Sequence, residues 1–87
     1  MLKAIAIRMD NIVYTGISYY KIVKDINHQT GNKVRGEFGF ITSSNTFVTQ
    51  QQAAIILHKA GYIHKPINIL TQSHFNSLRL QYPDKFK

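Results

Sequence analysis

The chain has 87 residues, and its eleven Lys and Arg against four Asp and Glu give a formal net charge of +7. It contains no cysteine, which excludes disulfides, thiolate zinc sites and thiol catalysis. No apolar run approaches the ~20 residues that cross a bilayer, and the N-terminal run is interrupted too early for a signal peptide, so we expect a soluble cytoplasmic protein without membrane contact.

Size and charge also set expectations about partners. We expect residues 1–87 to form a single domain. A domain this small buries a modest fraction of its surface, so a homo-oligomer, a dimer or higher, is the expected state. The positive charge favours a polyanionic partner such as a nucleic acid, a nucleotide or an acidic protein surface. The basic residues are dispersed along the sequence, so folding must assemble any positive patch.

The N-terminal part of the chain predicts a β-hairpin. Residues 3–9 alternate two sets of side chains with a period of two, which indicates a half-exposed strand. Asp10 and Asn11 tolerate turn geometry and lead into a second β-rich run at 12–15, which Gly16 ends.

An amphipathic helix is expected next. Ser18 can cap it, and apolar residues recur every three or four positions until about residue 27. The polar segment 28–33 is expected to be a mobile loop that leads into a third strand near residue 34.

The centre of the sequence predicts a second hairpin followed by a helix. Aromatic and β-branched residues fill 36–42 and 46–48, and the small polar residues 43–45 between them suit a tight turn. Thr49 and Gln52 match a capping box, which starts a helix at about residue 50. Gly61 stands where a left-handed closing residue is needed.

The C-terminal part of the sequence predicts one more helix. Residues 67–70 are either a short edge strand or an apolar clasp on the core. Thr71 can cap a helix that ends before Pro83, and the tail 84–87 is expected to fray. The elements together predict an α+β domain, with a small antiparallel sheet of four to five strands and two to three helices packed on one face.

The residues for catalysis are sparse. Only four carboxylates exist, and three of them lie in a predicted turn, on a helix surface and in the tail, so a carboxylate pair has few candidates. His58 and His64 bracket the end of the central helix at a spacing that is not typical of metal sites. No serine lies in a nucleophile turn. We therefore expect no enzymatic activity, no metal and no cofactor.

Aromatic side chains on a strand are stronger candidates. Alternation places Phe38 and Phe40 on one face and Gly39 on the other, where glycine permits close approach of a ligand or a second backbone. Phenylalanines at this spacing are either core residues or a platform for base stacking, and the pattern alone leaves both interpretations open.

The start of the central helix is another candidate. Backbone amides around Gln50 and Gln51 can donate to an anion, because the helix dipole favours negative charge there. The alternative is that Thr49 and Gln52 consume the available donors.

Three short motifs carry a resemblance to a known family. Residues 12–16 read Ile-Val-Tyr-Thr-Gly, residues 39–42 read Gly-Phe-Ile-Thr, and residues 47–48 read Phe-Val ahead of an alanine-containing helix that ends in Ala60-Gly61. Over roughly residues 4–63, the chain resembles the phage anti-defence sponges that capture cyclic ADP-ribose signals of the bacterial Thoeris system.

The resemblance implies an oligomeric protein without catalytic turnover that binds a cyclic nucleotide signal between subunits in the host cytoplasm. Some members of the family also hold cyclic oligonucleotides. Carried over by position, it implies ligand contacts at Tyr14, Gly16, Phe40, Asn45 and Phe47 and at the head of the central helix.

The sequence departs from the family pattern in two places. The family has a basic, histidine-containing segment after Thr-Gly, where this chain has Ser18-Tyr19-Tyr20, and an Asp-Arg after Phe-Val, where this chain has Thr49-Gln50. Glutamine in place of arginine loses charge-assisted phosphate contacts. The candidates to supply the missing charge are Arg8, Arg35, Lys59 and Arg79.

The leading hypothesis is a non-enzymatic protein that sequesters a small anionic cyclic nucleotide. The second is a small basic nucleic-acid-binding module, and the third is an inhibitor that docks on an acidic host protein. The expected ligand-binding residues are Arg8, Tyr14, Tyr19, Tyr20, Phe38, Phe40, Asn45, Phe47, Gln50, Gln51, Lys59 and Arg79.

Overall fold

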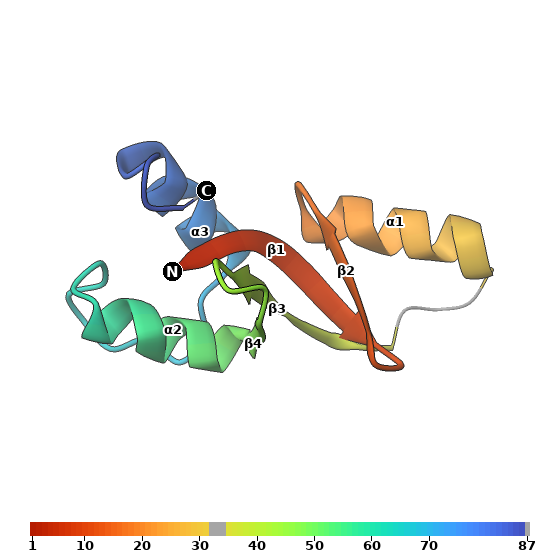
Figure 1. Ribbon diagram of the computed structural model, residues 1–87, viewed down its shortest axis with the longest axis horizontal. Coiled ribbons are helices and arrows are strands. Elements are labelled where there is room, and N and C mark those ends of the chain that lie inside the picture. Colours follow the sequence, from red (N-terminus) through yellow and green to blue (C-terminus); the bar gives the residue numbers. More distant parts are fainter. Residues whose placement is uncertain (32–34, 87) are drawn as a thin grey trace.

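The computed structural model describes residues 1–31 and 35–86, and these form a four-stranded antiparallel sheet with three helices. The strand order is β2-β1-β3-β4, and each neighbouring pair is antiparallel. The predicted α+β architecture is confirmed (Figure 1). In chain order the elements are β1 (Leu2–Met9), β2 (Ile12–Gly16), α1 (Tyr19–Thr30), β3 (Glu37–Thr42), β4 (Phe47–Thr49), α2 (Gln50–Lys59) and α3 (Gln72–Gln81).

Two tight turns build the sheet. Asp10 and Asn11 join β1 to β2 with φ angles of 52° and 63°, the left-handed pair that matches the twist of a two-residue hairpin. Asn45 has a φ of 63° in the turn between β3 and β4. Asparagine and aspartate tolerate this region better than other non-glycine residues, so the sequence predicted both turns correctly.

All three helices pack on one face of the sheet, as predicted. Ile5, Ile7 and Phe40 point from β1 and β3 into this layer, and all are fully or almost fully buried. Figure 1 shows α1 at one end of the long axis and α2 and α3 at the other. The helix residues buried against the sheet are Ile22 and Ile26 of α1, Ala53, Ala54 and Leu57 of α2, and Phe75 and Leu78 of α3.

The opposite face of the sheet carries the Arg8–Glu37 ion pair, the ring of Phe47 and the glycine Gly39. A Cβ atom on Gly39 would lie 2.0 Å from the carbonyl oxygen of Val48 and 2.8 Å from Cζ of Phe47. The space that glycine leaves open is therefore filled by the chain's own β4. Of the two partners expected to approach Gly39 closely, a ligand or a second backbone, the structure shows the backbone, that of Val48, together with the ring of Phe47.

The predicted helix starts are confirmed. Ser18 Oγ accepts a 3.0 Å hydrogen bond from the backbone N–H of Lys21, and both Thr49 and Thr71 form capping boxes. Gly61, with a φ of 87°, closes α2 as expected. Its N–H bonds to His58 O, while the N–H of Tyr62 bonds to Leu57 O, the paired pattern of a Schellman end.

The end of α1 differs from the prediction. The helix continues to Thr30, because Gly31 adopts a left-handed φ of 70° and donates its N–H to Asn27 O. The polar side chains at 28–30 are exposed on the last helical turn and not in a loop. The remainder of the predicted loop and the predicted strand start near residue 34 lie outside the described residues, and β3 begins at Glu37.

The C-terminal segment is more ordered than predicted. Residues 67–70 form a clasp and not a strand, since Leu70 is fully buried and donates its N–H to Gln50 O at 2.9 Å. The expected fraying of the tail is wrong for Phe86. Its side chain is fully buried, with ring centroids 5.4 Å from Tyr62 and 6.0 Å from Phe75.

Candidate functional site

The candidate site is a cleft of about 260 Å³ where β3 begins. β4 pairs with β3 only from Gly39 onward, so the first residues of β3 have no neighbour on that side. The first turn of α2 and the clasp at 67–70 border the resulting gap. The cleft is lined by Glu37, Phe38, Thr49, Gln50, Gln51 and Ile69.

One aromatic residue, Phe38, lines the cleft, and Tyr19 packs against it. Phe38 is 38% exposed, and its ring centroid lies 4.9 Å from that of Tyr19 at a tilt of 39°. Two hydrogen bonds of 2.7 Å fix Tyr19. Its hydroxyl Oη donates to Gly39 O, and its backbone N–H donates to Gln72 Oε1. Phe38 therefore rests on a side chain of fixed position.

The Tyr19 hydroxyl stays protonated over a wide pH range. Burial raises the pKa of Tyr19 to about 12, although a hydrogen bond with the Gln50 side chain acts in the opposite direction. A protonated phenol serves as the donor to Gly39 O. Tyr19 is thus a support for the cleft and not an acid or base near neutral pH.

The head of α2 provides polar groups to the same cleft. Its capping box consumes two donors: the N–H of Thr49 bonds to Gln52 Oε1 at 2.9 Å, and the N–H of Gln52 bonds to Thr49 Oγ1 at 3.1 Å. The N–H groups of Gln50 and Gln51 have no acceptor within the helix. Both residues line the cleft, where the helix dipole favours negative charge.

A second, more polar cleft of about 440 Å³ adjoins the first at Glu37. Two arginines, Arg8 and Arg35, and two carboxylates, Asp10 and Glu37, line it, so its formal charges balance. Arg8 donates from Nη2 and Nε to Glu37 Oε1 at 2.5 and 3.2 Å. Its guanidinium also lies 4.7 Å from the centroid of the Phe47 ring. An anion binding here must compete with Glu37 for Arg8.

Of the predicted aromatic residues, Tyr19 and Phe38 meet at the cleft and the others do not. Phe40 is fully buried, with its ring 5.1 Å from Phe75, so its predicted role in stacking on a ligand is wrong. Tyr14 packs against the core beneath the helices. Tyr20 is 77% exposed on α1, with no place in the cleft.

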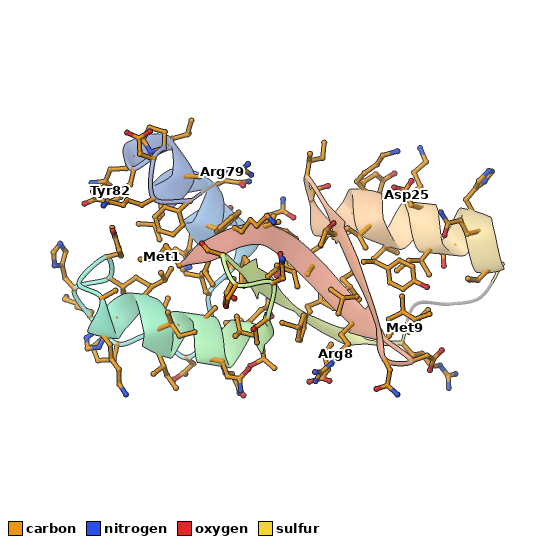
Figure 2. All side chains as sticks on the ribbon, viewed as in Figure 1. Met1, Arg8, Met9, Asp25, Arg79 and Tyr82 are labelled. Atoms are coloured by element: carbon orange, nitrogen blue, oxygen red, sulfur yellow. The ribbon has the colours of Figure 1, made fainter. Side chains whose placement is uncertain are left out.

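The predicted polar and basic residues are spread over the molecule. Asn45 accepts a 3.1 Å hydrogen bond from Lys3 in the turn before β4. Lys59 ends α2, at the opposite end from the cleft. Arg79 lies on α3 with its guanidinium 5.8 Å from the Phe75 ring. Figure 2 shows Arg8 and Arg79 on opposite sides of the molecule, so they do not converge on one anion within a single chain.

Three residues that line the cleft, Glu37, Thr49 and Ile69, were not among the expected ligand-binding residues; Thr49 was expected only as a helix cap. Ile69 reaches the cleft because the backbone bond between Leu70 and Gln50 ties the clasp to the head of α2. No local sequence signal marks that long-range contact. Glu37 had a weak signal, since it is the only carboxylate of the chain in a predicted strand.

Two kinds of feature are absent from the described residues. Within residues 1–31 and 35–86, no group of three or more metal-ligating side chains is placed to hold a metal ion. None of the helices in this part of the chain has the length and apolar character to cross a membrane.

The chain matches no family model, no curated protein and no solved structure among those compared with it.

Proposed function

We propose that this chain is a phage-type anti-defence protein that sequesters a small anionic cyclic nucleotide, a cyclic ADP-ribose isomer or a cyclic oligonucleotide, without hydrolysing it. One observation carries the proposal: the half-exposed ring of Phe38 faces a cleft that it shares with the amides at the start of α2. An aromatic surface beside hydrogen-bond donors is the pairing that a nucleobase and its attached phosphate require.

The cleft provides an aromatic ring and polar groups for such a ligand, while its one charged lining residue is the carboxylate of Glu37. A base stacked on Phe38 gains roughly 1–3 kcal/mol, by analogy with aromatic platforms for single strands. The side-chain amides of Gln50 and Gln51 can donate to and accept from a base edge. The dipole at the start of α2 stabilises a bound phosphate, and the net positive charge of the chain attracts it.

The size of the cleft supports a homo-oligomer. At about 260 Å³ it lies below the ~300–1,000 Å³ of sites that enclose a drug-sized ligand. A cyclic nucleotide with two phosphates would extend beyond one chain. We therefore place the remaining contacts, including any arginine, on a second copy of the protein.

The decisive experiment is a titration of the purified protein with cyclic ADP-ribose isomers and cyclic dinucleotides, followed by calorimetry. We expect binding to weaken at least tenfold in Phe38→Ala and in Gln50→Ala. Leu80→Ala is the matched control, because Leu80 is 86% exposed on α3 and away from the cleft, and it should bind like the wild type. Ligand recovered after denaturation should have its original mass. Equal binding by Phe38→Ala and the wild type would refute this site.

The charge supports a second candidate, a small basic nucleic-acid-binding protein. Its formal net charge is +7, and the ion pairs Arg8–Glu37 and Lys21–Asp25 each join one cation to one carboxylate. This candidate predicts binding to oligonucleotides that falls steeply as salt is raised. Cyclic-nucleotide binding at a defined stoichiometry, with weak dependence on salt, would favour the sequestering protein instead.

A further inference from the structure

One edge of the sheet has an unpaired strand. Within residues 1–31 and 35–86, β2 pairs with β1 alone, while β4 at the other edge is three residues long. In a hairpin closed by a two-residue turn, the two residues that flank the turn hydrogen-bond to each other through their backbone N–H and C=O groups. Here these residues are Met9 and Ile12. Along β2, the backbone groups of successive residues point alternately toward β1 and away from it. The backbone groups of Val13 and Thr15 therefore point away from the sheet, ready to pair with another strand.

This edge lacks the features that prevent strands from associating. β2 contains no charged residue and no proline, the two devices that commonly protect an exposed edge. Apolar side chains surround it: Ile12 is 54% exposed, Val13 38% and Ile17 80%. Pairing with a second strand would bury part of this apolar surface, and that burial would stabilise the pair.

Charge identifies the partner. Residues 9–20 contain no Lys or Arg, although the chain has eleven, and Asp10 is their only charged residue. Two copies of a chain with a net charge of +7 repel each other least where neither presents a cation. An unprotected edge in a stretch of the chain without a cation therefore fits a second copy of this chain.

We propose that two copies pair through β2 in antiparallel fashion around Tyr14, which extends the two sheets into one. In this register Val13 of each copy pairs with Thr15 of the other, which gives about four ladder hydrogen bonds. Asp10 of each copy approaches the first turn of the second copy's α1, which holds Lys21 and no acidic residue. A carboxylate is stabilised at that end of a helix, so the register is self-complementary in charge.

The β2 edge lies on the side of the sheet opposite β4 and the cleft, so this pairing is independent of the second copy that the proposed function requires at the cleft. Its test uses no ligand, so failure of the pairing is distinguishable from failure of the proposed function. The measurement is sedimentation equilibrium of the full chain. Thr15→Pro removes an outward N–H and leaves the bonds to β1 in place. Thr15→Val is the matched control, because it keeps that N–H. Val13→Lys adds a charge at the edge, and Gln81→Lys adds the same charge at the end of α3.

The wild type, Thr15→Val and Gln81→Lys should have twice the mass of one chain, or a larger even multiple. Thr15→Pro and Val13→Lys should dissociate at least tenfold more readily, with unchanged circular dichroism. If Thr15→Pro does not fold, Val13→Lys decides the question. A monomeric wild type at high micromolar concentration, or edge variants with the wild-type mass, would overturn the proposal. A monomer that captures an added extended peptide would also overturn it and assign the edge to another protein.

Discussion

Tyr19 donates a hydrogen bond of 2.7 Å from its hydroxyl to the carbonyl oxygen of Gly39, which ties the first turn of α1 to the middle of β3. On the other face of the sheet, the ring of Phe47 lies against the same glycine. Gly39 is thus held by a phenol from one face and a phenyl ring from the other. This arrangement fixes the strand immediately after the segment of β3 that lines the open cleft at Phe38.

Replacing Tyr19 with phenylalanine should destabilise the fold modestly. The change leaves the ring contact with Phe38 in place but removes the donor to Gly39 O, and such a bond contributes about 1 kcal/mol net. The free energy of unfolding, measured with urea, should fall by about that amount. Tyr20→Phe is the control, because Tyr20 is 77% exposed, and it should change little. Equal effects of the two substitutions would contradict the importance of the Tyr19 bond.

The same tyrosine should make stability depend on alkaline pH. Burial raises the pKa of Tyr19 from 10.0 in the unfolded chain to about 12 in the folded protein. Below pH 10 the phenol is protonated in both states, so its contribution to stability is fully present. Between pH 10 and about 12 the unfolded chain releases the proton first, which favours unfolding. Thermal melts of wild type and Tyr19→Phe across this range should show a steeper fall of Tm in the wild type.

Gly39 should be the glycine least tolerant of substitution among those tested. In Gly39→Ala, the new methyl group would meet the Val48 carbonyl oxygen at 2.0 Å, and the backbone of β4 would have to move. We expect a cost of about 3 kcal/mol or more. Gly61→Ala is a useful comparison, since Gly61 has a left-handed φ of 87° but no atom near its missing Cβ. Conformational strain alone costs roughly 1–2 kcal/mol there, so urea denaturation should rank Gly39→Ala as the more damaging change.

Local signals predicted much of the fold. The turn at Asp10 and Asn11 and the caps at Thr49 and Thr71 depend on side chains a few residues apart, and the structure confirms all of them. The end of α1 differs from the prediction because the polar side chains at 28–30, which are typical of a loop, lie on the last turn of the helix. The left-handed Gly31 was the better guide to where the helix stops.

The candidate site was harder to predict, because it depends on contacts between distant segments. Alternation correctly put Phe38 and Phe40 on one face of β3, but it could not tell which of them stays accessible. Phe40 lies against Phe75 of α3, 35 positions along the chain, whereas Phe38 lies beyond the end of β4. The position of α3 over β3 determines which phenylalanine is buried. The alternation of residues along the strand carries no information about that position.

Phe86 provides a test of the C-terminal segment, which sequence composition predicts to fray. Its ring is fully buried against Phe75 and Tyr62, so removing it leaves a cavity in the core that helix α3 shares with the sheet. Phe86→Ala should lower the free energy of unfolding by about 3–5 kcal/mol, a large part of the total for a domain of this size. The control is Leu80→Ala, because Leu80 is 86% exposed and its truncation should cost less than about 0.5 kcal/mol. A urea midpoint that is the same for both variants would mean that the tail contributes nothing to the core.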